Sequence, residues 1–322
     1  MKVLFYNSPP FFLAHGGMQT LTEGLMREVA ALGVEVEPQR WWDEKQKGDI
    51  IHHVGRAPIT EVRLAHQKGM KVVMTDILSQ VSSRGRGQLF VQKTVMDFAR
   101  MVVPNGFLVR LGWEVYQEVD ALVYAVEHDR DTAEYLFHAD RARTHVIWPA
   151  LESEQIAALG QPEEAGDYLV CLATIYPVKN NVLLARAAKL AGTPIVFLGK
   201  PFAEDDPYFE EFKKLADGKL VRYAGFAAGE AKNQWLRGAR GFVLLSQFES
   251  GSNAVNEAAA AGLPLLLSDL PWANRVYPRS PNITFVSPRS VDRVAPALRA
   301  FYEQARRQRE ATFAVLTWRQ AA

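Results

Sequence analysis

Cysteine is nearly missing from this sequence. Cys171 is the single cysteine among 322 residues, so no disulfide can form within the chain, and we expect a reducing compartment. The neighbours of Cys171 in "YLVCLA" are apolar. Such surroundings are typical of a thiol buried in a strand and argue against a catalytic nucleophile.

Long hydrophobic runs are missing too. No apolar run approaches the roughly 20 residues of a membrane-spanning helix, and the N-terminal run in "MKVLFYNSPPFF" stops at Asn7. A signal peptide needs a longer apolar core and a small-residue cleavage site. We therefore expect a cytoplasmic protein, with peripheral contact to a membrane at most.

The chain also lacks an excess of charge of one sign. It has 37 basic and 36 acidic residues, so no basic field points to nucleic acid as the main partner. The sequence shows no clustered aspartates for a metal ion. His52 and His53 are neighbours in an expected strand, and their side chains would point to opposite faces. We expect no metal site and no cofactor.

Two common nucleotide-binding motifs, GxGxxG before a helix and GxxxxGK[ST], are absent as well. What is present is a regular alternation of short apolar runs and amphipathic helical stretches, which predicts parallel sheets with helices on both faces. The expected strands lie at 2–6, 34–38, 48–55, 70–76, 120–126 and 144–150, and then at 168–173, 194–199, 219–225, 241–246, 263–269 and 282–288.

An acidic, turn-rich stretch, "LESEQIAALGQPEEAGD", separates the two runs of strands. We place an N-terminal domain at 1–152, a linker at 153–166 and a C-terminal domain at 167–322. The predicted fold class is α/β, with two consecutive Rossmann-like domains. Ligands of such sheets bind beyond the C-terminal ends of the strands, so we expect the active site in a cleft between the halves.

Three residues near expected helix starts are candidates for anion binding. Gly16 and Gly17 precede the first helix, where glycines let backbone N–H groups approach an anion beside the positive end of the helix dipole. Lys179 stands just before a helix of the second half and could reach a diphosphate. The alternatives are a plain loop for the glycines and a solvated surface side chain for the lysine.

Two carboxylates, Glu249 and Glu257, stand with seven residues between them in "LLSQFESGSNAVNEAAAAGLPLLLSD". Glu249 follows an expected strand, and Ser252 or Asn253 can cap the next helix, which places Glu257 in an early turn near the same sheet edge. Glu257 could simply complement the helix dipole. That alternative gives no purpose to Glu249 or to the "SGSN" loop.

Most of this stretch, "FESGSNAVNEAAAAGLPLLLSD", resembles the E-x7-E donor-binding motif of retaining GT-B glycosyltransferases, particularly family 4. Further segments resemble the same family in the same order along nearly the whole chain. These are the glycine loop with its helix in "GGMQTLTEGLMREVAALGVEV", then "DIIHHVG", "DALVYAVEHDRD" and "LTWRQAA".

The resemblance implies a role for each motif residue. Glu257 would accept hydrogen bonds from the donor ribose, and Glu249 would contact the donor sugar as the catalytic residue. Lys179 and preorganised N–H donors would stabilise the charge that builds on the leaving diphosphate. The residues implied around the diphosphate are Gly16, Gly17, Ser252 and Asn253, and those implied near the nucleobase are Gly199 and Phe226.

The sequence departs from the family pattern at several places. Thr174 stands where the family carries a diphosphate-binding arginine, a contact typically worth about 1.5–3 kcal/mol. Asp76 follows the fourth strand without the usual preceding histidine. Arg84 and Arg86 in "SSRGRG" could hold a phosphorylated or lipid-linked acceptor, or form a solvated mobile loop. These three residues, Asp76, Arg84 and Arg86, are the acceptor-side candidates.

The main hypothesis is therefore a retaining glycosyltransferase. It would move a sugar from a nucleotide-diphosphate donor, UDP-linked rather than GDP-linked, to a carbohydrate, lipid-linked or small-molecule acceptor. A degenerate GT-B protein that binds nucleotide or sugar without transfer is the alternative, because Thr174 replaces the arginine. A GT-B epimerase fits less well, because those enzymes lack the E-x7-E arrangement.

Overall fold

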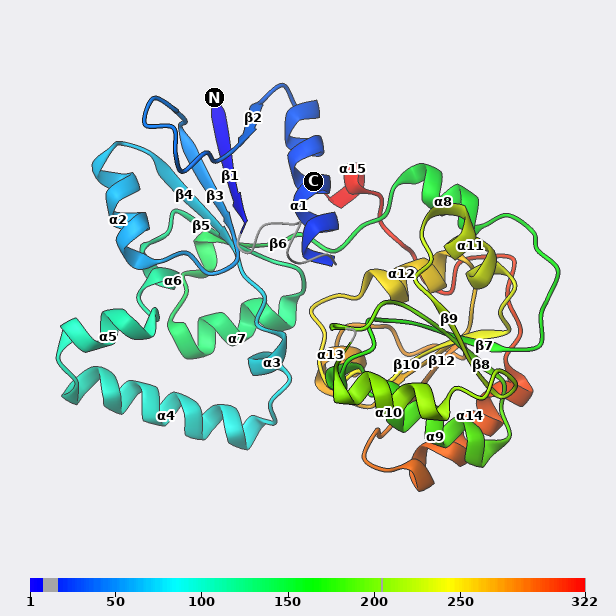
Figure 1. Ribbon diagram of the computed structural model, residues 1–322. Helices are drawn as coiled ribbons and strands as arrows, with labels where there is room; N and C mark the ends of the chain where they lie inside the picture. Colours follow the sequence, from blue (N-terminus) through cyan, green and yellow to red (C-terminus); the bar gives the residue numbers. More distant parts are fainter. Residues whose placement is uncertain (8–16, 204, 322) are drawn as a thin grey trace. The chain divides into compact units, whose positions relative to one another are not determined.

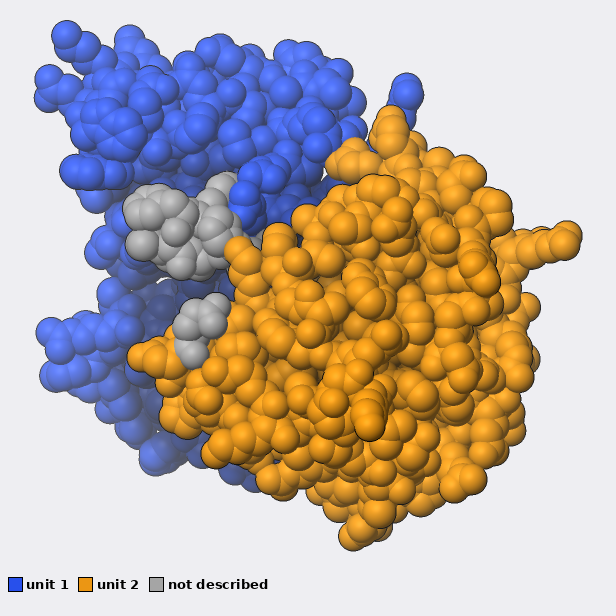
Figure 2. Space-filling view, turned by 45° about the vertical axis from the view of Figure 1, so that its right-hand side comes forward, with its two compact units in different colours: residues 1–149, 318–322 blue, residues 150–317 orange. Residues whose placement is uncertain are grey.

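The computed structural model describes residues 1–7, 17–203 and 205–321. The chain forms two compact units, residues 1–149 with 318–322, and residues 150–317 (Figure 2). Each unit contains a six-stranded sheet in which all neighbouring strands are parallel. The expected α/β fold class with two Rossmann-like halves is confirmed.

The first unit follows the predicted alternation of strands and helices (Figure 1). Its strand order is β2-β1-β3-β4-β5-β6, so the chain changes direction across the sheet between β1 and β3. Its elements are β1 (Lys2–Asn7), α1 (Gly17–Ala31), β2 (Glu35–Pro38), β3 (Ile50–Val54), α2 (Ile59–Gln67), β4 (Lys71–Thr75), α3 (Ser79–Ser82), α4 (Arg86–Val102), α5 (Asn105–Leu111), α6 (Val115–Glu118), β5 (Ala121–Tyr124), α7 (Glu127–Phe137), the 3-10 turn Arg141–Arg143, β6 (Thr144–Val146) and α15 (Trp318–Ala321).

The second unit has the strand order β12-β11-β10-β7-β8-β9. The chain first runs from β7 to β9 and then continues with β10 on the other side of β7. Its elements are α8 (Ser153–Leu159), β7 (Leu169–Leu172), the 3-10 turn η2 (Pro177–Lys179), α9 (Asn181–Ala191), β8 (Ile195–Leu198), α10 (Pro207–Leu215), β9 (Val221–Gly225), α11 (Gly229–Arg237), β10 (Gly241–Leu244), α12 (Asn253–Ala260), β11 (Leu265–Ser268), α13 (Pro271–Asn274), β12 (Ile283–Val286) and α14 (Val291–Gln304).

Side chains of the second sheet alternate between two apolar cores. Leu169 and Cys171 belong to the core under α9 and α14, whereas Val170 belongs to the core on the opposite face. This alternation follows from the two-residue period of a strand, and burial on both faces explains the continuous apolar runs in the sequence. The predicted burial of Cys171 is confirmed, and burial raises the pKa of its thiol to about 12.

Two stretches contain more helix than the sequence indicated. Residues 153–166, expected as a linker, include α8, whose Leu159 is buried in the core of the second unit. The expected "SSRGRG" loop is reduced to a short connection, because α3 ends at Ser82 and α4 begins at Arg86. The side chain of Gln88 accepts a hydrogen bond from the N–H of Gly85, which caps α4.

The C-terminal residues 318–322 belong to the first unit. Trp318 is buried there and lies against α1, at a place where Gly24 leaves room for the ring. A Cβ atom at Gly24 would come within 2.7 Å of two atoms of the indole. The chain therefore returns to the first unit at its C-terminus, where Trp318 packs against α1. The division at Pro149 lies close to the expected boundary at residue 152.

Candidate functional site

The best candidate site lies at the C-terminal ends of β7 and β10 in the second unit. These two strands are neighbours in the sheet, and they flank the point where the chain changes direction. Loops that leave a parallel sheet on either side of such a point diverge, which makes this place the usual ligand site of a doubly wound sheet. Lys179 follows β7 and Glu249 follows β10, so both expected residues lie at this edge.

Lys179 and Glu249 form an ion pair. The lysine Nζ lies 2.6 Å from Oε1 of Glu249, and the hydroxyl of Ser246 donates to the same oxygen at 2.6 Å. The loop of Lys179 is tied to β10 by the side-chain amide of Asn180, which donates to the carbonyl of Leu245 at 2.7 Å. Asn180 adopts the left-handed conformation that this turn into α9 requires. Lys179, for which the sequence left open a diphosphate contact or a solvated surface position, is therefore held at the edge of the sheet by Glu249.

Glu257 has a parallel environment on the other side of the motif. It is buried in the second turn of α12, and its Oε1 accepts from Nζ of Lys232 at 2.5 Å and from the side-chain amide of Gln155 at 2.7 Å. Lys232 lies on α11 and Gln155 on α8, two helices that pack together beside α12 (Figure 1). A buried carboxylate needs compensating charge and hydrogen bonds, and Lys232 and Gln155 supply both to Glu257.

The two carboxylates share one feature. In each, a lysine and a neutral donor occupy Oε1, and among the described residues Oε2 of each accepts no hydrogen bond. A carboxylate oxygen held in this way has a fixed direction and retains its capacity to accept from a hydroxyl. The arrangement provides two preorganised hydroxyl acceptors, one at each end of the E-x7-E segment.

The N-terminus of α12 lies between these two glutamates in sequence. Ser252 occupies the N-cap position, but its side chain makes no capping hydrogen bond, and its N–H donates to the hydroxyl of Tyr277 at 3.1 Å. The N–H groups of Asn253 and Ala254 meet no acceptor among the described residues. Unpaired N–H groups at the positive end of a helix favour an anion.

Gly199 directly follows β8, and packing explains why this residue is a glycine. Its φ is +148°, and a Cβ there would come within 2.0 Å of the carbonyl oxygen of Ala173. The carbonyl of Gly199 accepts from the hydroxyl of Tyr223 at 2.9 Å. The backbone of β8 thus passes close to the start of the β7–α9 loop, where Thr174 is exposed and presents a hydroxyl in place of a cation.

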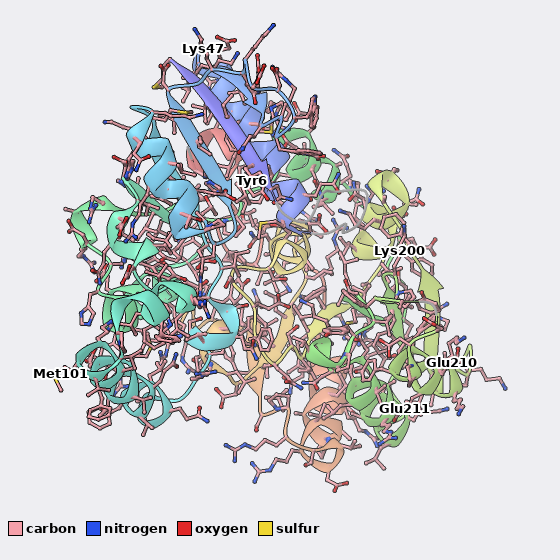
Figure 3. The ribbon with its side chains drawn as sticks, turned by 60° about the vertical axis from the view of Figure 1, so that its left-hand side comes forward. Tyr6, Lys47, Met101, Lys200, Glu210 and Glu211 are labelled. Carbon is pink, nitrogen blue, oxygen red and sulfur yellow. The ribbon has the colours of Figure 1, made fainter. Side chains whose placement is uncertain are left out.

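Phe226 follows β9, and its ring is exposed. The ammonium of Lys200 lies 4.5 Å from the ring centroid, which is a cation–π distance. Lys200, which is labelled in Figure 3, is the second residue after β8. The family resemblance implied Phe226 near the nucleobase, and the structure adds Lys200 beside its ring.

The acceptor-side candidates of the first unit lie in different surroundings. Asp76 is buried after β4, where it accepts from the hydroxyl of Tyr116 at 2.5 Å and lies 3.6 Å from Nε of Arg56. Burial, together with the charge of Asp76, raises the pKa of Tyr116. Arg84 donates to the side chain of Gln92, and Arg86, the first residue of α4, is exposed.

The glycine pair is only partly described. Gly16 lies outside the described residues, and Gly17 is the first residue of α1. His52 and His53 contact different residues: His52 hydrogen-bonds Thr75, and His53 lies 3.8 Å from Glu61. Burial lowers the pKa of both rings to about 4. The described part of the chain contains no group of three or more ligating side chains placed to hold a metal ion.

Sequence reasoning missed Lys232 and Gln155. Lys232 lies within an expected helix and belongs to no motif, and Gln155 falls in the stretch that was expected to be a linker. Nothing in the local sequence marks either residue, because each meets Glu257 only through the packing of three helices. Both contacts span long distances along the chain, 25 and 102 residues.

Comparison with known proteins shows what the chain is similar to. Residues 166–304 match the family model "Glycosyl transferases group 1", which includes the E-x7-E segment. No curated protein matches the chain in sequence. The expected resemblance to family 4 glycosyltransferases is confirmed.

Solved structures share the fold of the whole chain at low sequence identity. The Anabaena protein HepE, solved with UDP and glucose, is 15% identical with a TM-score of 0.63, and the match covers 100% of this chain and 93% of that one. A glycosyltransferase from Rickettsia africae is 11% identical with a TM-score of 0.66, covering 94% and 88%. A sucrose-phosphate synthase from Thermosynechococcus elongatus is 15% identical with a TM-score of 0.65, covering 94% and 90%. The chain therefore has the GT-B fold.

Proposed function

Because residues 166–304 form a group 1 glycosyltransferase domain within a GT-B chain, we propose that the protein is a retaining, metal-independent glycosyltransferase. It transfers a sugar from a UDP-linked donor to an acceptor bound by the first unit, and the anomeric configuration of the sugar is kept. The observation that carries the proposal is the pair of anchored carboxylates, each with one oxygen held by a lysine and the other available. HepE has been solved with UDP-glucose, which supports the choice of base.

Glu257 binds the ribose of the donor in this proposal. Its Oε1 is held by Lys232 and Gln155, so Oε2 is the oxygen that accepts from the ribose hydroxyls. Because the carboxylate is already oriented and charge-balanced, little ordering is lost when the ribose binds. Phe226 and Gly199 lie at the ends of neighbouring strands and serve the nucleobase.

Glu249 contacts the donor sugar, and Lys179 beside it serves the diphosphate. Breaking the bond between sugar and diphosphate places negative charge on the leaving oxygen. The ammonium of Lys179 and the unpaired N–H groups at the start of α12 are preorganised donors that stabilise this charge. Gly16 and Gly17 of the first unit, and Ser252 and Asn253 of the second, are further candidates for binding the diphosphate.

The acceptor is a carbohydrate, a lipid-linked sugar or a small molecule. Asp76, Arg84 and Arg86 remain the candidates for its recognition. Arg86 is exposed and has no carboxylate partner among the described residues, so it suits an acidic group. Asp76 is engaged by Tyr116 and Arg56, which suits a positioning role.

A second candidate function is binding of the nucleotide sugar without transfer. Thr174 is exposed where the family carries an arginine, and a hydroxyl cannot replace a charged contact to the diphosphate. The fold and the two anchored carboxylates would serve both functions equally. The two functions differ in whether the bound nucleotide sugar is cleaved and its sugar transferred.

Titration of UDP into the Glu257→Gln variant tests the donor site. We expect affinity to fall by about tenfold or more, because a charge-assisted hydrogen bond is worth about 1.5–3 kcal/mol. Glu210→Gln on the outer side of α10 (Figure 3) is the matched control and should leave affinity unchanged. Equal affinity for the wild type and Glu257→Gln would remove the ribose role. Incubation of the wild type with a panel of UDP-sugars then separates the two functions, because hydrolysis or transfer of any donor excludes binding alone.

A further inference from the structure

The first unit exposes an unusual number of apolar side chains on α4 and α5. Figure 1 shows these consecutive helices at the end of the unit opposite β2, and Figure 3 shows Met101 pointing away from the protein. We call this area the α4–α5 surface. Its exposed apolar side chains are Phe90, Val91, Val95, Phe98, Met101 and Val102 on α4 and Phe107 and Leu111 on α5.

The spacing on α4 is that of one helix face. Val91, Val95, Phe98 and Val102 follow each other at intervals of four, three and four residues, and all are more than half exposed. The opposite face of α4 contributes little to the core, because Met96 is the one buried side chain of this helix. At 1.5 Å per residue, the exposed stripe from Val91 to Val102 is about 17 Å long. An apolar face of this length turned to solvent marks an interaction surface.

The charges around this stripe are mostly positive. Residues 84–111 contain five basic side chains and one acidic one, a net charge of +4. The single acid, Asp97, is already engaged by Lys93 at 2.8 Å and Arg100 at 2.7 Å. Arg86 and Arg110, near the start of α4 and the end of α5, have no carboxylate partner among the described residues.

We propose that the α4–α5 surface docks the protein on an anionic lipid bilayer. The apolar side chains would enter the boundary between headgroups and acyl chains, and Arg86 and Arg110 would contact lipid phosphates. The protein lies on the bilayer and does not cross it: among the described residues, no helix has the length and apolar character of a membrane span. This contact would bring a lipid-borne acceptor to the first unit, but it does not depend on the proposed transfer.

Charge selects the bilayer over a second copy of the chain. A two-fold contact would place the same surface against itself, so two areas of net charge +4 would repel each other. An anionic lipid surface supplies the opposite charge to every exposed arginine at once. The apolar stripe alone would fit either a bilayer or a second copy of the chain, whereas the positive charge fits only the anionic bilayer.

Co-sedimentation of the full chain with vesicles tests this proposal. We expect binding to phosphatidylcholine vesicles that contain phosphatidylglycerol, at least tenfold weaker binding to pure phosphatidylcholine, and further weakening with salt. Phe98→Ser combined with Met101→Ser should weaken binding at least tenfold, and Arg86→Gln with Arg110→Gln should do the same at low salt. All four side chains are exposed, so the variants should fold and still bind UDP.

Leu190→Ser is the matched control, because Leu190 is equally exposed on α9 of the second unit. It should sediment like the wild type. Three results would overturn the proposal: no binding of the wild type to anionic vesicles, equal binding of the Phe98→Ser/Met101→Ser variant, or a wild-type dimer that this variant converts to monomer. Loss of UDP binding in the Glu257→Gln variant would be unaffected by any of these results.

Discussion

The contact between Lys232 and Glu257 leads to the sharpest prediction. Nζ of Lys232 lies 2.5 Å from Oε1 of Glu257, and the two side chains are only 17% and 10% exposed. Substituting Lys232→Met keeps most of the apolar stem and removes the charge. Glu257 then retains the side-chain amide of Gln155 as its only donor among the described residues.

The expected cost follows from burial. Removing one partner of a fully buried ion pair costs about 3–5 kcal/mol, because an uncompensated charge is left behind. The remaining exposure and the amide of Gln155 reduce this figure, so we expect about 2–3 kcal/mol. Lys213→Met on α10 is the matched control: its partner Glu210 is also 2.5 Å away, but the pair is 45% and 51% exposed. Such surface pairs contribute about 0.5 kcal/mol or less.

Hydrogen exchange of the α12 amides, followed by mass spectrometry, measures the local free energy without requiring the two units to unfold together. A loss of 2 kcal/mol corresponds to roughly 30-fold faster exchange. The double variant Lys232→Met/Glu257→Gln should recover at least half of this loss, because the buried carboxylate is gone. Equal exchange in the Lys232→Met and Lys213→Met variants would refute the assignment of a buried pair.

UDP affinity gives a second and independent readout. Lys232 holds Oε1 of Glu257 and leaves Oε2 to the ribose, so Lys232→Met should weaken UDP binding by about tenfold through loss of orientation. Tighter binding in this variant would mean that Lys232 competes with the nucleotide for Glu257. That result would reverse the role that we assign to the lysine.

Three further predictions concern the rest of the chain. Burial lowers the pKa values of His52 and His53 to about 4, so their contribution to the free energy of unfolding is complete above the unfolded pKa near 6.5 and is lost as pH falls toward 4. Hydrogen exchange of the β3 amides should show a loss of about 4 kcal/mol for the pair between pH 8 and pH 5. A free energy that stays constant over this range would contradict the burial of the two rings. Gly24→Ala should release the ring of Trp318 and expose the C-terminus to proteolysis, although alanine favours the helix by about 1 kcal/mol. Thr174→Arg should strengthen UDP binding by roughly 10- to 150-fold, by restoring a charged contact of about 1.5–3 kcal/mol; calorimetry that shows no gain would place Thr174 away from the diphosphate.

The sheets could be predicted from the sequence because their strands carry the signal locally. Each apolar run, such as "YLVCLA" or "PIVFLG", became a strand of the expected sheet, since burial on both faces requires every residue of the run to be apolar. The same pattern placed Lys179 just before a helix and Glu249 after a strand, and both lie there in the structure. Strand order then brought β7 beside β10, which no single segment of sequence specifies.

The contacts that complete the site could not be predicted in this way. Gln155 lies on α8, a seven-residue helix whose acidic, turn-rich surroundings suggested a linker, and only packing against the second core shows Leu159 to be buried. Similarly, Gly24 gives no local sign of the indole that lies against it, because Trp318 is almost 300 residues later in the chain. In each case the partner is set by tertiary packing, which overrides local pattern.

In the proposed donor site, the balance of charge explains why an arginine at position 174 would matter. Lys179 and Lys232 each neutralise one carboxylate, so the four side chains together carry no net charge. Under the proposed function, a diphosphate would meet no excess of positive charge from these four side chains, and the N–H groups at the start of α12 would be its main donors. If Thr174 lies beside the diphosphate as proposed, an arginine there would add the one positive charge that the two ion pairs do not supply.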